Sequence, residues 1–280
     1  MDDLFPPFAP DPNEARPRLF KPVPFRVIAP NLITLMALCL GLTAIRLAFE
    51  GRLEPAVIAI VVAALLDGVD GRVARLLKGT SRFGAELDSL SDFLNFGCAP
   101  ALVLYGFVLH DLKSWGWTVA LVFAIAMALR LARFNAMLDD PQRPEWKKNF
   151  FVGMPAPAGA MTALLPVYLS LRGYIPADLT VFGAVVIALY TLAIALFMVS
   201  TVPTFSGKTA GKRVPRHWVL PIFVVTVALF GLVLSYPFEA LALAAFAYLA
   251  AIPFGVARYR QMAREAGIEA AAAAPTPEGP

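Results

Sequence analysis

The sequence is poor in charge. Asp, Glu, Lys and Arg make up 16% of its 280 residues, whereas 59% are hydrophobic and the mean hydropathy is +0.68. This composition excludes a soluble core and indicates a protein that crosses the membrane several times. The net charge of +4 does not indicate nucleic-acid binding, because the Lys and Arg residues lie in short segments beside apolar runs, where the positive-inside rule accounts for them.

Cysteine is also scarce. Cys39 and Cys98 both lie inside apolar runs, without the spacing of a disulfide or a metal site, so we interpret them as small core residues. The first 25 residues are polar and rich in proline and lack an apolar central stretch. We therefore expect no cleavable signal peptide, and we expect the first membrane helix to target the chain.

Long apolar runs, in contrast, are abundant. Eight of them are candidates to cross a bilayer, at about 30–49, 55–77, 86–109, 117–138, 151–171, 179–202, 218–235 and 238–256. They predict an all-α, polytopic membrane helix bundle of about eight transmembrane helices. Placing both termini in the cytoplasm puts 20 of the 24 Lys and Arg residues on that side. Only Arg46, Arg52, Lys113 and Arg172 then lie near the other face.

Four carboxylates stand at regular spacings between two of these runs. Asp67 and Asp70 are three residues apart and Asp88 and Asp92 four apart, so each pair projects from one face of its helix. Four ionised carboxylates at the end of membrane helices repel one another, and one Asp at mid-membrane already costs roughly 2.5–3.5 kcal/mol. Two divalent cations, Mg²⁺ or Mn²⁺, would neutralise them, and such a pair clamps a phosphoryl group during its displacement.

The residues around these acids leave room for a ligand. Gly71 and Ala74 share the face of the first acid pair, and Gly84 lies one turn before Asp88, so a ligand could approach the backbone there. Arg72 and Arg75 would meet phosphate oxygens or the acids themselves. The alternative reading of the acids is an ion path in a transporter or channel. That reading predicts acids near mid-membrane and repeated halves, but these acids lie at one end of the helices and no internal repeat is visible.

The whole pattern, D-x-x-D-G-x-x-A-R followed after eight residues by G-x-x-x-D-x-x-x-D, resembles the signature of the CDP-alcohol phosphotransferase family. The resemblance implies displacement at the β-phosphorus of CDP-diacylglycerol by an alcohol, with release of CMP. It implies that Asp67, Asp70, Asp88 and Asp92 hold two cations, with Asp88 and Asp92 catalytic and Asp92 also a general base. It further implies a homodimer in the bacterial inner membrane with the active site facing the cytoplasm, and no nucleic-acid partner.

Polar residues on neighbouring runs are candidates to complete this site. Asn31 and Thr34 begin the first run and could cap the helix or bond a ligand, and the resemblance favours contact with the nucleotide. The nucleotide and phosphate candidates are thus Asn31, Thr34, Gly71, Ala74, Arg75 and Gly84. Ser91 and Asn95 lie one turn around the second acid pair, and they could either support the acids or join helices to one another.

The acceptor alcohol is indicated by strings after the signature. R-L-A-R-F-N, S-L-S-D-F-L-N-F-G-C-A-P-A and G-M-P-A-P-A resemble those of the phosphatidylserine synthase branch, so L-serine is the expected acceptor. Its carboxylate needs a cation, and Arg130, Arg133 and Lys208 are candidates to bind it or the lipid phosphate. The two arginines could instead be anchors at the cytoplasmic end of their helix. Choline, glycerol 3-phosphate and inositol phosphate remain alternative acceptors.

The resemblance also divides the chain. We expect a cytoplasmic N-terminal arm at 1–28, a catalytic core of six helices at 29–216, two additional transmembrane helices at 217–258 and a disordered tail, rich in Ala and Pro, at 259–280.

Overall fold

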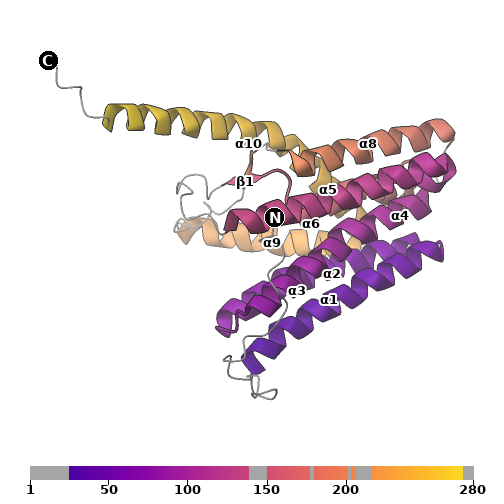
Figure 1. Cartoon of the computed structure of the whole chain (residues 1–280), viewed down its shortest axis with the longest axis horizontal. Coiled ribbons are helices and arrows are strands. Elements are labelled where there is room, and N and C mark those ends of the chain that lie inside the picture. The colour runs from indigo at the N-terminus through magenta and orange to yellow at the C-terminus, as the bar shows by residue number, and fades with distance from the viewer. Residues whose placement is uncertain (1–24, 139–149, 177–179, 201–202, 206–215, 274–280) are drawn as a thin grey trace, which may run out of the picture.

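The structure is a computed structural model that describes residues 25–138, 150–176, 180–200, 203–205 and 216–273 and is almost entirely helical (Figure 1). The first half consists of α1 (Phe25–Phe49), α2 (Leu53–Leu76), α3 (Arg82–Asp92), a π-helix (Phe93–Cys98), α4 (Ala99–Phe107), a 3₁₀ turn (Leu109–Leu112) and α5 (Ser114–Leu138). The second half consists of β1 (Phe150–Val152), α6 (Ala156–Ala163), α7 (Leu165–Leu171), α8 (Val181–Val199), β2 (Pro203–Phe205), α9 (Arg216–Ser235) and α10 (Pro237–Ala273).

Six of these helices are long and apolar enough to cross a membrane. They comprise residues 26–49, 82–107, 114–137, 181–199, 218–235 and 237–259. The second and fifth expected spans are missing from this set for different reasons. The α2 helix is long enough, at 24 residues, but carries acids and arginines in its last turns. The fifth run is broken after Leu164 into α6 and α7, because Pro166 lies in the first turn of α7 and has no N–H with which to continue α6.

The expected all-α class is confirmed, with the addition of a short antiparallel ribbon of β1 and β2 in which Phe150 lies opposite Phe205. One further expectation differs from the structure. The last helix does not end near residue 258, because its Ala- and Glu-rich sequence continues α10 through Ala273. The expected arm up to residue 24, the loops at 139–149 and 206–215 and the last seven residues lie outside the described residues.

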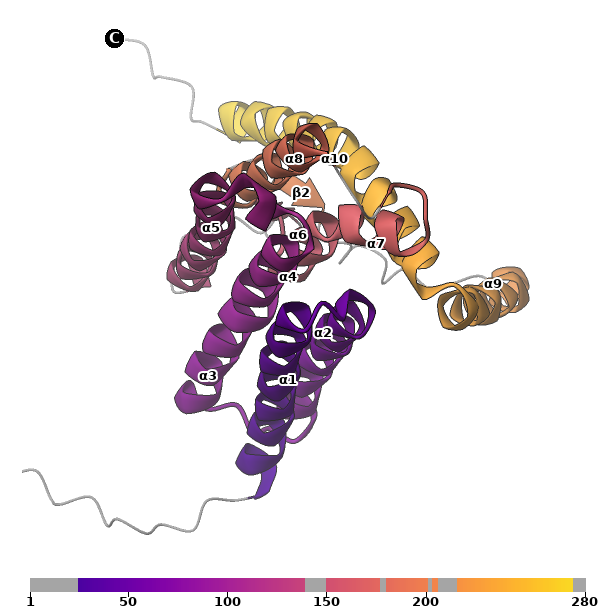
Figure 2. The same ribbon diagram turned by 90° about the vertical axis from the view of Figure 1, so that its right-hand side faces the viewer.

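Small residues hold α1 and α2 together. On α1, Ala37, Ala44 and Ala48 are buried, and on α2 Ala56 and Ala63 are fully buried. Such residues let two helix backbones approach closely within a membrane. In Figure 2, α1 and α2 lie side by side, with α3 and α4 crossing beside them. This packing brings the first turns of α1, the last turns of α2 and the start of α3 together.

The C-terminal helices differ from each other. The α10 helix packs against α6 and α7, and its Phe238, Ala242 and Ala245 belong to the main apolar core. Glu239 of α10 also forms an ion pair with Arg172, which follows α7. None of the apolar span of α9 is buried, and Figure 2 shows α9 beside α10 and far from α5. Of the two helices expected as additions, α10 therefore contributes side chains to the apolar core, and α9 does not within the described residues.

Candidate active site at the ends of three helices

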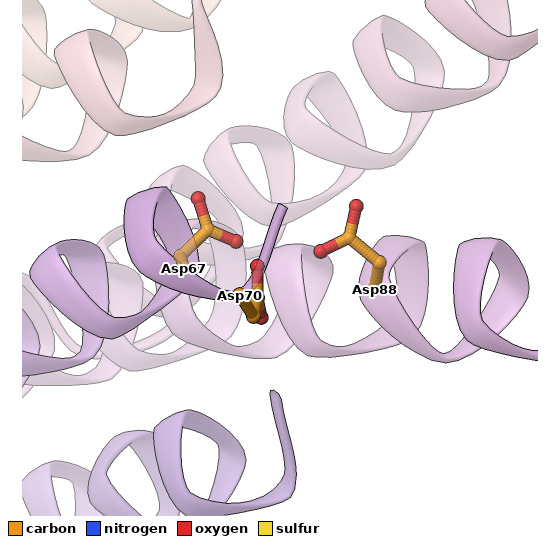
Figure 3. Close-up of side chains that lie close together, drawn as sticks. All are labelled: Asp67, Asp70 and Asp88. Atoms are coloured by element: carbon orange, nitrogen blue, oxygen red, sulfur yellow. The ribbon is translucent and has the colours of Figure 1, made fainter. Parts of the chain in front are cut away.

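Three of the four acids meet where α2 faces α3. One carboxylate oxygen each from Asp67, Asp70 and Asp88 lies within 4.8 Å of the other two. Figure 3 shows Asp67 and Asp70 reaching from α2 toward Asp88, whose carboxylate points back at them. Asp70 is 3% exposed, whereas Asp67 and Asp88 are half-buried. The structure therefore brings together three of the four acids that the sequence predicts as metal ligands.

Asp92, the fourth acid, is the last residue of α3, one turn beyond Asp88. Its carboxyl group lies beside that of Asp67, and its Oδ1 atom is buried without a hydrogen-bond partner among the described residues. It also lies within electrostatic range of the Arg130 guanidinium on α5. Asp92 thus borders the three-carboxylate cluster, on the side where α5 approaches.

The acid cluster opens into a cavity of about 170 Å³ between α1, α2 and the start of α3. All six sequence-predicted nucleotide or phosphate residues line it, together with Asp70 and Asp88: Asn31, Thr34, Gly71, Ala74, Arg75 and Gly84. The rest of the lining is Pro30, Gly79, Thr80, Ser81 and Ala85. The structure therefore brings the whole predicted set into one place.

The two glycines shape this cavity in different ways. A Cβ on Gly71 would meet only the tip of Arg75, at 3.7 Å, so the space beside it is open. A Cβ on Gly84 would come within 2.7 Å of Asn31 Oδ1 and 3.1 Å of Ser81 Oγ. The space beside Gly84 is thus filled by the Asn31 and Ser81 side chains, whereas Gly71 leaves volume for a ligand.

Sequence reasoning missed the connection between α2 and α3. Gly79, Thr80 and Ser81 line the cavity, and Ser81 Oγ accepts a hydrogen bond of 3.0 Å from the Gly84 backbone N–H. This is an N-cap, and the signal was available, because Ser directly before the first residue of a helix is a typical N-cap. Ser81 therefore fixes the first turn of the helix that carries Asp88.

Thr34, which the sequence assigns to the helix cap or the nucleotide, contacts one of the acids directly. Its hydroxyl is 2.7 Å from Asp70 Oδ2 and 3.1 Å from the Pro30 carbonyl oxygen, and its side chain is 5% exposed. Asn31 is half-buried at the cavity wall. Of the two α1 residues, Thr34 holds a carboxylate and Asn31 faces the open space.

The two arginines of α5 are both bound to backbone carbonyls. Arg130 Nε donates to the Met154 carbonyl oxygen at 3.1 Å, and the guanidinium lies 5.6 Å from the centre of the Phe134 ring. Arg133 donates to the carbonyl oxygens of Val199 and Ser200, at 2.5 and 3.4 Å, where α8 ends. Arg130 thus lies near Asp92, whereas Arg133 caps α8. Lys208 lies outside the described residues.

The donor set fits a divalent cation. Three clustered carboxylates supply the hard oxygen ligands that Mg²⁺ and Mn²⁺ prefer, and the unpartnered Asp92 Oδ1 is a further acceptor at the same place. Within the described chain, no ion pair engages the clustered acids, so a bound cation would supply their missing counter-charge.

Comparison with known proteins agrees with this geometry. The family model described as CDP-alcohol phosphatidyltransferase matches residues 27–190, which include the four acids and every helix that borders the cavity. The chain belongs to the CDP-alcohol phosphatidyltransferase family. A second model, CDP-alcohol phosphatidyltransferase 2, matches residues 217–253, in α9 and α10.

Several curated members of the CDP-alcohol phosphatidyltransferase family are similar over most of the chain. A CDP-diacylglycerol--serine O-phosphatidyltransferase of Mycobacterium leprae is 38% identical over 256 residues, covering 89% of this chain and 81% of its own. Proteins of the same name from Helicobacter pylori and Bacillus subtilis are 34% and 29% identical, covering 82% and 68% of this chain and 90% and 97% of their own.

Proposed function

We propose that this protein transfers the phosphatidyl group of CDP-diacylglycerol to the hydroxyl of L-serine, giving phosphatidylserine and CMP. The observation that carries the proposal is the acid cluster at the mouth of a cavity lined by six of the eight signature residues, all but Asp67 and Asp92. The similar proteins that bear the serine transferase name supply the acceptor. The reaction belongs to phospholipid biosynthesis and requires a membrane-bound transferase, in agreement with the six apolar helices.

Asp67, Asp70 and Asp88 would hold Mg²⁺ or Mn²⁺, two ions per site, with Asp92 as an additional ligand. When bound, the cations neutralise charge on the pyrophosphate and make its β-phosphorus a better electrophile. The chain's own residues then orient the substrate. Gly71 and Ala74 leave room for the cytidine, Asn31 offers an amide to it, and Arg75 at the cavity wall offers a guanidinium to the phosphates.

Asp92 is the residue placed to activate the acceptor. A serine hydroxyl is a weak nucleophile, so a carboxylate within hydrogen-bond reach assists by accepting its proton. The serine oxygen forms a new bond to the β-phosphorus, the bond from that phosphorus to the oxygen of CMP breaks, and the hydroxyl proton passes to Asp92. The buried and unpartnered Oδ1 atom supports this role, since it has a free acceptor position.

The carboxylate of L-serine also needs a binding group. Of the three cationic side chains proposed from the sequence, Arg130 is the one placed to bind this carboxylate. Its Nε is held by the Met154 carbonyl, and it lies near Asp92. Arg133 is engaged at the end of α8, which favours a structural role. Lys208 stays a proposal from sequence alone.

The finer topology also belongs to the proposal. We infer eight spans, with α2 and the α6–α7 pair crossing besides the six apolar helices, both termini in the cytoplasm, and the active site facing the cytoplasm of a bacterial inner membrane. Supporting this, Arg72, Arg75, Lys78 and Arg82 gather at the end of the bundle that carries the acids, and an excess of Lys and Arg is typical of a cytoplasmic face. A homodimer is expected from the family resemblance.

The test is CMP release from CDP-diacylglycerol by the purified protein with Mg²⁺ or Mn²⁺, offering L-serine, glycerol 3-phosphate, inositol phosphate or choline in turn. We expect turnover with serine alone, its loss on chelation by EDTA, and a fall of at least about 10²-fold for Asp92→Asn, in line with removal of a general base. Turnover with another alcohol would overturn the choice of acceptor. If no acceptor led to CMP release, the proposal that the protein is this kind of transferase would be overturned.

A further inference from the structure

Buried polar side chains are few in the described chain, and most of them are connected. Six residues of this kind are buried: Thr34, Asp70, Ser91, Asn95, Thr162 and Thr191. The first four, from α1, α2, α3 and the π-helix, lie in one row behind the acid cluster. Thr191 instead bonds only within its own helix, to the Ile187 carbonyl at 2.8 Å.

The row is a chain of hydrogen bonds that ends on a predicted metal ligand. Asn95 Nδ2 donates to Ser91 Oγ at 3.1 Å, and Ser91 Oγ donates to the Thr34 carbonyl oxygen at 3.4 Å. The Thr34 hydroxyl, in turn, lies 2.7 Å from Asp70 Oδ2. Because Asp70 is 3% exposed, water cannot readily replace this donor. Thr34 therefore governs the orientation of the Asp70 carboxylate.

The far end of the row is anchored by an unusual close approach. Asn95 is fully buried in the π-helix that follows Asp92, and its Oδ1 has no hydrogen-bond partner among the described residues. A Cβ on Gly41 of α1 would collide with this oxygen. Single π-helical turns often lie at functional sites, because they redirect the side chains around them. Here the turn directs Asn95 toward α1.

We infer that Asn95 and Ser91 are positioning residues for the metal site, acting through Thr34 on Asp70. This inference rests on the proposed function, because it assumes that Asp70 binds a cation. Asn95 packs against Gly41 and so sets the position of α1 relative to α3. Ser91, through its hydrogen bond to the Thr34 carbonyl oxygen, holds Thr34 at that position. Residues that orient a ligating carboxylate commonly change metal affinity or activity by 10- to 100-fold when they are replaced.

The experiment is a titration of the purified protein with Mn²⁺, in which the signal of the free ion is followed by electron paramagnetic resonance without nucleotide or serine. The variants are Asn95→Leu and Thr34→Val, which keep the volume but remove the polar groups, and Thr34→Ser, which restores the hydroxyl. Thr191→Val is the matched control, since it removes a buried hydroxyl far from the acids. Thermal unfolding of each variant is recorded in parallel.

We expect Asn95→Leu and Thr34→Val to weaken Mn²⁺ binding by roughly tenfold or more. Thr34→Ser and Thr191→Val should bind Mn²⁺ as the wild type does. Asn95 does not line the cavity, so the KM for CDP-diacylglycerol should stay unchanged in Asn95→Leu at saturating metal. Unchanged Mn²⁺ affinity in Thr34→Val and Asn95→Leu, with only a lower unfolding temperature, would overturn the inference. Absence of Mn²⁺ binding by the wild type would instead overturn the proposed cation site.

Discussion

At the scale of single residues, the absence of a side chain matters as much as its presence. Gly68 and Gly71 lie one turn apart on α2, and neither would meet a clashing atom if it gained a Cβ. Only Gly71 lines the cavity. The open space beside Gly71 is therefore part of the cavity that we assign to the substrate, whereas the open space beside Gly68 lies outside it.

We expect Gly71→Ala to raise the KM for CDP-diacylglycerol while leaving stability intact. The added methyl projects into the volume assigned to the nucleotide, and overpacking of this kind costs roughly 1–3 kcal/mol, which is about tenfold in affinity for each 1.4 kcal/mol. Steady-state CMP release over a range of lipid concentrations measures the effect, with Gly68→Ala as the control. Equal kinetics for the two variants would mean that the nucleotide does not lie against Gly71.

The residues of the acid cluster were predictable because helical spacing alone places them. Asp67 with Asp70, and Asp88 with Asp92, each lie on one helix face, and the signature glycines mark where two backbones or a ligand approach. The bond from Thr34 to Asp70 was not predictable in the same way, because it joins residues 36 apart in sequence on two different helices. The spacing of residues along one helix shows which of them share a face. It does not show which face of another helix packs against them.

At the scale of elements, α5 shows how two similar residues take different tasks. Arg130 and Arg133 are three apart, yet Arg130 reaches the Met154 carbonyl and Arg133 reaches the last carbonyls of α8. Gly153, at φ +76°, makes the turn before α6, and a Cβ there would meet the carbonyl oxygens of Met198 and Ser200. Gly153, the first residue of the G-M-P-A-P-A string, thus allows a tight turn to pack against the end of α8.

Arg133→Met should therefore destabilise the protein without changing its use of serine. Losing hydrogen bonds from a charged donor to buried carbonyls costs about 1.5–3 kcal/mol, and the KM for serine should stay near the wild-type value. Thermal unfolding in detergent and serine titrations measure the two effects. The comparison is Arg130→Met, for which we expect a higher KM for serine. A higher serine KM in Arg133→Met at unchanged stability would assign Arg133 to the acceptor instead.

The elements themselves were predicted unevenly. Long apolar runs gave α1, α5, α8 and α9 close to their observed bounds, because length and hydropathy suffice for an uninterrupted helix. The division of the fifth run at Pro166, the π-helix inside the third and the ribbon of β1 and β2 depend on local backbone geometry and on pairing between distant segments. A hydropathy pattern gives neither the local backbone geometry nor the pairing of distant segments.

At the scale of the whole molecule, charge is sorted between the two ends of the bundle. Opposite the acid cluster, Arg46 pairs with Glu50 at 2.7 Å, Arg52 approaches Glu50 at 3.8 Å, and Arg172 pairs with Glu239. At the other end, within the described residues, Arg72, Arg75, Lys78 and Arg82 are exposed and enter none of the ion pairs found. Excess positive charge therefore gathers on the side that carries the acids, as expected for a cytoplasmic face.

This arrangement predicts that α2 crosses the membrane despite its charges. In a background with Cys39→Ala and Cys98→Ala, Arg52→Cys in intact spheroplasts should react with a membrane-impermeant maleimide, whereas Lys78→Cys should react only after permeabilisation. The two positions flank α2 and are both exposed. Labelling of both from the same side would show that α2 does not span the bilayer.

The charges of α2 also bear on how the protein is made. A helix with Asp67, Asp70, Arg72 and Arg75 in its last turns partitions poorly into lipid on its own, whereas α1 partitions readily. The short link from Glu50 to Arg52 and the close packing of small residues join the two helices directly. If α2 crosses the bilayer as proposed, we expect it to insert together with α1, so that the clustered acids enter the bilayer as part of a helical hairpin rather than as a separate segment.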